Sequence, residues 1–174
     1  MSSSYINFFG VWLSKGWGPV RVRYHWALTV GPKVEEEGGI GVRYHAKERP
    51  KLGEGSERRF EERESPLAPT SMLLVRVMVG KVADGNQLSK VCAVRLSGRL
   101  NQDGIVSWVK EALEKLKADT KALGTSVIEW GRVRSEAMGY CQRKKAQNRF
   151  DGQGNFYMSK VPTFDLMERK EISI

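Results

Sequence analysis

NQDGIVSWVKEALEKL, residues 101–116, is the stretch on which the predicted fold depends. No proline interrupts it, and Asp103 stands where the N-cap of a helix is expected. Successive residues of a helix are about 100° apart, so the apolar residues of this segment lie on one side of it. These are Ile105, Val109, Ala112 and Leu116, flanked by Trp108 and Leu113. We therefore expect an amphipathic helix that packs its apolar side against a core.

Short runs of β-branched and aromatic residues precede this helix and predict strands. The expected strands cover residues 5–13, 20–31, 40–47 and 72–83, of which the last is the best candidate for a central strand. Asp84 then follows as the cap of a short helix that reaches residue 94. A second long helix is expected over residues 127–147. Its apolar stripe consists of Trp130, Val133, Ala137, Tyr140 and Cys141.

This order of elements predicts an α+β fold in which an antiparallel sheet packs against two main helices. The 174 residues are enough for one domain with a real core. Residues 48–71 are dense in charge and punctuated by Gly and Pro, so we expect a flexible loop there, with a mobile part at 50–56 and a short edge strand near 58–62. Residues 150–174 contain a Gly-rich turn and a Pro and are expected to follow the surface as extended chain.

The composition narrows the classes of function without selecting one. Lys and Arg outnumber Asp and Glu by 29 to 20, which favours contact with nucleic acid, acidic surfaces or anionic substrates. Two cysteines in a chain of this length form no disulfide framework, and no Cys/His spacing indicates zinc. We expect no metal and no cofactor. The apolar N-terminal residues follow no basic segment, so the sequence predicts neither a signal peptide nor a membrane span. We therefore expect a cytoplasmic location.

Two expected strands carry the same tetrapeptide, Val-Arg-Tyr-His, at residues 22–25 and 42–45. The polar, Gly-ended connector between them is typical of a hairpin, which would bring His25 and His45 roughly opposite each other. Side chains alternate along a strand, so His25 shares a face with Ala27, and Trp26 lies on the other face. Both imidazoles are then expected on the more polar side of the sheet.

The segments YHWALTVG, RYHAKE and IVSWVKEAL resemble two groups of proteins. One is the permuted papain-like fold of the lecithin:retinol acyltransferase class, in which an HWA-type strand histidine precedes a helix that begins with Asn-Cys. The other is a largely uncharacterised family of fungal proteins, in which SWV follows Asn-Cys-Val. This second resemblance covers most of the chain and includes GKV, KALGTSV and MSKVPTFDL. The papain-like resemblance implies that His25 and His45 have catalytic roles beside the start of the helix.

The nucleophile of that motif is absent from this chain. Its Cys falls on Ile105 and its Asn on Gly104, and neither residue can attack a carbonyl group. Ser107 points about 200° around the helix from Ile105. Of the two cysteines, Cys92 is expected on another element, and Cys141 on the core stripe of the second long helix. Ordinary thiol hydrolysis is therefore expected to be lost.

The first hypothesis is a pseudoenzyme or non-hydrolytic enzyme that binds a small acyl or peptide-like ligand. Its cleft would be formed by the two histidines together with Trp26, Asp103, Gly104 and Ile105. A second hypothesis is a tRNA-dependent aminoacyl transferase, such as a cyclodipeptide synthase, with His25 as general base on an amine. In that case the RNA would be held by basic residues of the second long helix, namely Arg132, Arg134, Arg143, Lys144, Lys145 and Arg149. These residues are equally typical of a solubilising helix end, and a basic interaction module is the third hypothesis.

Overall fold

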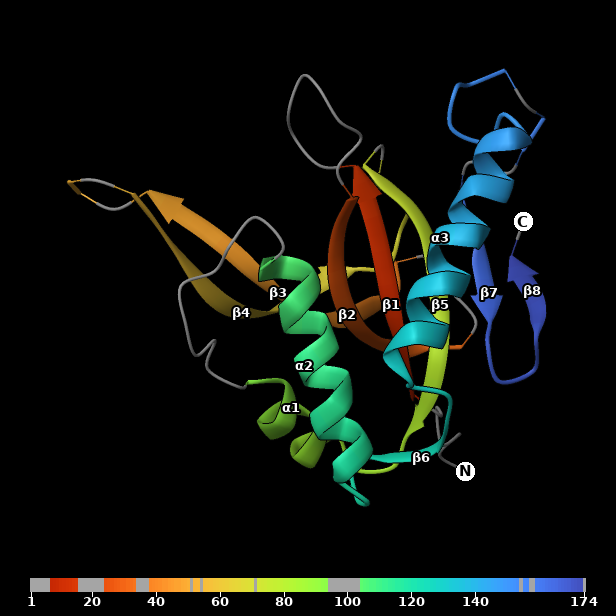
Figure 1. The fold of residues 1–174 in the computed structure, drawn as a ribbon. Coiled ribbons are helices and arrows are strands. Elements are labelled where there is room, and N and C mark those ends of the chain that lie inside the picture. Colours follow the sequence, from red (N-terminus) through yellow and green to blue (C-terminus); the bar gives the residue numbers. More distant parts are fainter. Residues whose placement is uncertain are drawn as a thin grey trace.

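The computed structural model describes residues 7–15, 24–33, 38–50, 52–53, 55–70, 72–93, 104–153, 155–156 and 159–173. Within these ranges, only the backbone is described for residues 7–15, 47–50, 56–59 and 104–105. The described elements form a mixed α+β structure in which helices pack on one sheet (Figure 1). The predicted fold class is therefore confirmed.

One sheet contains all the described strands. Their bounds are β1 Asn7–Lys15, β2 Tyr24–Pro32, β3 Ile40–Pro50, β4 Ser56–Pro66, β5 Leu73–Val82, β6 Leu123–Ser126, β7 Thr163–Asp165 and β8 Lys170–Ser173. The strand order is β4-β3-β2-β1-β5-β7-β8, and β6 pairs with β5. All of these pairs are antiparallel except the parallel pair of β5 and β7. The sheet is thus antiparallel for most of its width, as expected.

Three helices follow the long strands: α1 Gly85–Cys92, α2 Gly104–Ala118 and α3 Trp130–Ala146. Figure 1 shows α2 and α3 side by side over one face of the sheet, with α1 beside the C-terminal part of α2. The helix α1 begins as predicted, because the carboxylate of Asp84 accepts a hydrogen bond from the backbone N–H of Gln87 at 3.0 Å. None of the described helices is long and apolar enough to cross a membrane.

The main core lies between this face of the sheet and the helices. The predicted stripe of α2 is buried at Trp108, Val109, Ala112, Leu113 and Leu116. The predicted stripe of α3 is buried at Val133, Ala137, Tyr140 and Cys141. Both stripes pack on apolar residues of β2 and β5, among them Trp26, Leu28, Val75, Val77 and Val79. Each fully buried aliphatic side chain of this size contributes about 1.5–3 kcal/mol, so the two helices are held mainly by apolar burial.

Two predictions on the sheet need correction. The edge strand expected near 58–62 is present, but it is longer than predicted: residues 56–66 form β4, which pairs with β3 along its whole length, so less of 48–71 is loop than expected. Residues 150–174 were expected to follow the surface, but β7 inserts beside the central strand β5. Val161, Thr163 and Asp165 are consequently buried. The polar composition of the two segments does not predict these strands in full. Each strand forms because a neighbouring strand pairs with it, and composition alone does not show that pairing.

Candidate functional site

The two histidine side chains meet where β2 and β3 part. Their ring centroids lie 5.9 Å apart, with the ring planes at 84°. The ladder between these strands joins Leu28 to Tyr44 and ends there, so the histidines are diagonal neighbours just beyond its end. The expectation that the hairpin brings His25 and His45 together is confirmed, although they are not directly opposite each other.

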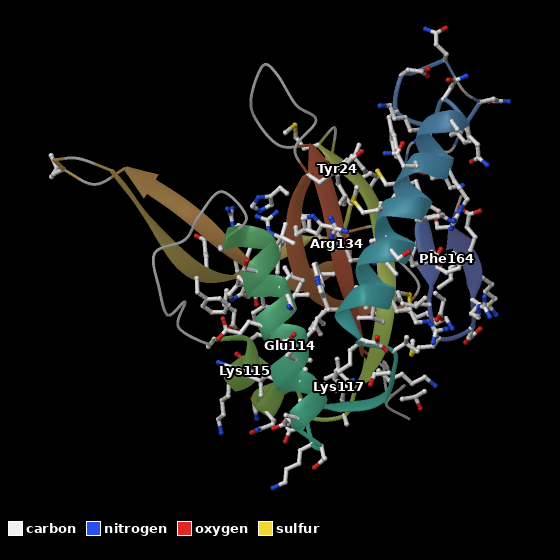
Figure 2. All side chains as sticks on the ribbon, in the orientation of Figure 1. Tyr24, Glu114, Lys115, Lys117, Arg134 and Phe164 are labelled. Atoms are coloured by element: carbon white, nitrogen blue, oxygen red, sulfur yellow. The ribbon has the colours of Figure 1, made fainter. Side chains whose placement is uncertain are left out.

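The imidazole of His25 points away from the helices. Its chain neighbours Tyr24 and Trp26 both contact α3. The ring of Trp26 lies 5.4 Å from that of Trp130, and Gln142 donates a hydrogen bond of 3.4 Å to the hydroxyl of Tyr24. Figure 2 labels Tyr24 beside α3. Side chains alternate along a strand, so His25 lies on the opposite face of the sheet.

The imidazole of His45 lies on the same outer face. On the helix side of β3, Tyr44 stacks on Phe60 of β4 at 6.1 Å, and Phe60 in turn lies 5.9 Å from Trp108 of α2. His45 follows Tyr44 and therefore points the other way. We call the surface that carries His25, Arg43, His45, Glu61 and Arg63 the histidine face.

A carboxylate of the edge strand holds His45. Glu61 is the residue directly opposite His45 in the ladder between β3 and β4. Its Oε2 lies 2.6 Å from His45 Nε2, and the side chains are 30% and 12% exposed. Such a carboxylate orients an imidazole and leaves Nδ1 to face other groups.

Positive charge is concentrated beside this pair. Arg43 and Arg63 are directly opposite each other on β3 and β4. Burial, the nearby His45 and the positive charge of Arg43 lower the pKa of His25 from 6.5 to about 4. Burial and the positive charge of Arg63 likewise lower the pKa of Arg43, which Glu61 partly offsets. At neutral pH, His25 is therefore an uncharged hydrogen-bonding group.

A cleft was expected between the histidines and the start of the long helix. The structure differs, because the imidazoles and the start of α2 lie on opposite faces of the sheet. Trp26, predicted to line that cleft, is 3% exposed and belongs to the core beneath α3. Gly104 and Ile105 open α2 on the helix side of the sheet, the face opposite the imidazoles, and the Ile105 side chain lies outside the described part. Asp103 is also outside the described residues. The physical reason is strand alternation, which sends Trp26 and His25 to opposite faces.

Neither cysteine replaces the missing nucleophile. Both thiols are free and buried, Cys92 on α1 and Cys141 on α3. Burial raises the pKa of Cys92 to about 12 and also raises the pKa of Cys141, so both remain protonated thiols at neutral pH. In the described part of the chain, no three His, Cys, Asp or Glu side chains gather to hold a metal ion.

Two of the six predicted RNA-binding residues are buried, which corrects their assignment. Lys144 is 2% exposed and pairs with Glu171 of β8, and Arg149 is 4% exposed and donates to the carbonyl of Lys160 at 2.9 Å. Arg143 is exposed but pairs with Glu136 at 2.7 Å. The other three predicted residues, Arg132, Arg134 and Lys145, are exposed on α3. The partners of the buried cations come from the C-terminal segment, whose position the helix pattern does not show.

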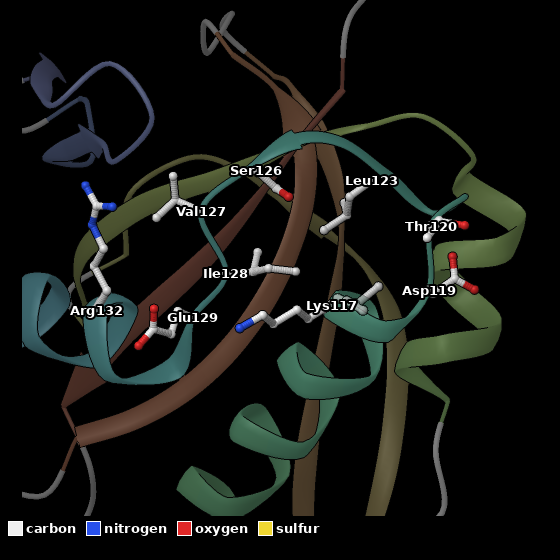
Figure 3. Close-up of a pocket in the computed structure, with 10 residues that line it drawn as sticks. Lys117, Asp119, Thr120, Leu123, Ser126, Val127, Ile128, Glu129 and Arg132 are labelled. Atoms are coloured by element: carbon white, nitrogen blue, oxygen red, sulfur yellow. The ribbon is translucent and has the colours of Figure 1, made fainter.

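A groove of about 400 Å³ lies at the opposite end of α2 from the predicted cleft (Figure 3). It is bounded by the last turn of α2, by β6 and by the residues that lead into α3. The side chain of Lys117 extends toward Glu129, with Ile128 beside it (Figure 3). Asp119 also lines the groove, but its carboxylate is used by Gln87 and by the backbone of Lys121 and Ala122. This groove is separate from the histidine face.

Sequence reasoning missed Glu61 and Arg63 because it treated the charged segment around them as solvated surface. Glu61 and Arg63 alternate with Phe60 and Glu62 along β4. Because side chains alternate between the two faces of a strand, this pattern could have indicated that Glu61 and Arg63 share a face. The register that places them opposite His45 and Arg43 follows from the β3–β4 hairpin.

Comparison with known proteins identifies a family. No curated protein and no solved structure matches the chain. One family model, described as a family of unknown function, DUF6914, matches residues 11–173. That range contains the described strands and helices from β2 to β8, with both histidines and the residues around them. The chain belongs to the DUF6914 family.

Proposed function

We propose that this protein binds a small acyl or peptide-like ligand at its histidine face through hydrogen bonds, without a covalent thiol step. The observation that carries the proposal is the contact between His25 and His45, with Glu61 held 2.6 Å from His45. Two oriented imidazoles offer both donor and acceptor nitrogens within a short distance. An amide or ester group presents a matching acceptor carbonyl, and an amide adds a donor N–H.

The charge state of His25 favours binding over proton abstraction. An effective general base has a pKa near the working pH, whereas the pKa of His25 is lowered to about 4. A neutral imidazole of this kind is a poor base at pH 7, but it still donates and accepts hydrogen bonds. We therefore prefer a binding protein or non-hydrolytic enzyme to a transferase that uses His25 as a base.

Descent from a permuted papain-like enzyme is part of this proposal. Its support is the sequence resemblance, together with a helix that begins at Gly104 and packs on a sheet carrying both histidines. The absence of a thiol at Ile105 agrees with a protein that binds without cleaving. Because the imidazoles lie on the outer face, we place the ligand there rather than at the start of α2.

The aminoacyl-transferase alternative has weaker support. It requires RNA contact along α3, where Lys144 and Arg149 are buried. The exposed residues Arg132, Arg134 and Lys145 leave a smaller basic surface. RNA binding therefore remains a separate prediction.

The proposal is tested by NMR titration of the two imidazoles, which are the only histidines of the chain. N-acetylglycinamide serves as a neutral peptide-like probe and N-acetylglycine as its acidic counterpart. We expect at least one of them to shift both imidazole resonances saturably, and His25→Gln and His45→Gln to weaken that binding at least tenfold. Gln142→Ala, on the helix side, is the control and should leave binding unchanged. Absence of saturable shifts with both probes would refute the proposal.

A further inference from the structure

The histidine face holds more positive charge than its own acidic residue can neutralise. Arg43 and Arg63 stand directly opposite each other across β3 and β4. Like charges in this position repel each other and destabilise a sheet. Among the side chains of this face that the structure describes, Glu61 is the acidic one, and it contacts His45.

Arg43 also has unsatisfied hydrogen-bonding capacity. Its Nε is buried and has no hydrogen-bond partner in the described structure. Neither Arg43 nor Arg63 forms an ion pair with any other described residue. A buried guanidinium N–H without an acceptor costs free energy that an incoming acceptor would recover. Glu61 is the nearby anion, and its carboxylate contacts His45, so Arg43 Nε still lacks an acceptor.

We propose that Arg43 and Arg63 form a subsite for a single carboxylate group of the ligand, next to the imidazoles of His25 and His45. This inference rests on the proposed function and names the chemical class of its ligand, an acidic acyl or peptide-like molecule. The fork of donors on a guanidinium matches the two oxygens of a carboxylate.

With both imidazoles uncharged, charge balance favours one negative charge over two. Two guanidinium groups and the Glu61 carboxylate leave a net charge of one before the imidazoles are counted. A monoanionic carboxylate cancels that charge, whereas a phosphate dianion would leave an excess of negative charge. The ligand would then place its carboxylate on the arginines and its acyl or amide group on the histidines.

Binding of an anion also offsets part of the electrostatics that act on His25. Burial, His45 and then the positive charge of Arg43 lower the pKa of His25. A carboxylate bound between the two groups favours the protonated imidazole instead. The pKa of His25 should therefore rise when the subsite is filled.

The experiment compares probes that differ in charge. Affinities for N-acetylglycine, N-acetylglycinamide and inorganic phosphate are measured by NMR titration of wild type, Arg43→Gln and Arg63→Gln. We expect wild type to bind N-acetylglycine at least tenfold more tightly than N-acetylglycinamide and phosphate. Each variant should lose that preference while keeping its affinity for the amide. Arg134→Gln, an exposed arginine of α3, is the matched control and should retain the preference.

The outcomes separate the two proposals. If neither acetylglycine probe binds, the proposed function fails. If both bind equally well to wild type, or if both variants keep the preference, only the carboxylate subsite fails. Tighter binding of phosphate overturns the assignment to a single carboxylate, and an equal loss in Arg134→Gln overturns the assignment to these arginines. Should Arg43→Gln not fold, the exposed Arg63→Gln decides the test alone.

Discussion

Acidification should destabilise the fold through His25. The unfolded chain binds a proton at this imidazole near pH 6.5, whereas the folded protein binds it near pH 4. Between these values the unfolded state holds more protons than the folded state. The contribution of His25 to the free energy of unfolding is therefore fully present above about pH 6.5 and is lost as the pH falls toward 4. His45, Arg43, Arg63 and Glu61 are the charged or titratable groups around it on the face.

The size of this effect follows from the pKa shift. The whole shift corresponds to about 3 kcal/mol, of which about 2 kcal/mol is lost between pH 7 and pH 5. His25 is only partly buried, so solvent screening reduces this value. We therefore expect His25 to lower the free energy of unfolding by at least about 1 kcal/mol between pH 7 and pH 5. Removing the titrating group with His25→Gln should abolish this part of the pH dependence.

The assay is urea unfolding of wild type and His25→Gln at pH 7 and pH 5. Other titrating groups contribute to both proteins, so the difference between the two pH dependences isolates His25. NMR titration of the imidazole C–H signals, assigned with His45→Gln, gives its pKa directly. Equal pH dependences in the two proteins, or a measured pKa above about 6, would falsify the reasoning.

Two further predictions concern α3. The Glu171 carboxylate accepts from Tyr140 and pairs with the buried Lys144, and Glu171→Gln weakens both contacts. We expect the free energy of unfolding, measured with urea, to fall by about 2–4 kcal/mol. The exposed control Glu114→Gln should lower it by less than about 0.5 kcal/mol. Similar losses in the two variants would show that the pair with Lys144 is not a stabilising contact. If α3 binds RNA, the double variant Arg132→Glu and Arg134→Glu should weaken binding of a labelled RNA at least tenfold by fluorescence anisotropy, with steep dependence on salt. Affinity that is insensitive to salt and to both substitutions would exclude this helix as the RNA site.

Much of the local structure could be predicted because it depends on neighbouring residues. The period of the apolar residues in 101–116 predicts both the helix α2 and its buried side, as Val109, Ala112 and Leu116 show. Asp84 caps α1 through a hydrogen bond to a residue three positions away. The repeated tetrapeptide and its connector likewise predict that the two histidines meet, since a hairpin pairs nearby segments.

Features that depend on distant partners could not be predicted in this way. The C-terminal segment looks like surface chain, yet β7 lies parallel to β5, and Glu171 neutralises a lysine that the helix pattern assigns to solvent. Composition alone does not reveal such pairings, because they depend on which segments pack together.

The sequence by itself determined that His25 and Trp26 lie on opposite faces of one strand, because side chains alternate along any strand. Only the tertiary structure decided which face the helices cover, because that depends on where α2 and α3 bury their apolar stripes. The packing of Trp26 against Trp130 assigns the helix side to the core and leaves the imidazoles with Arg43, Glu61 and Arg63 on the outer face.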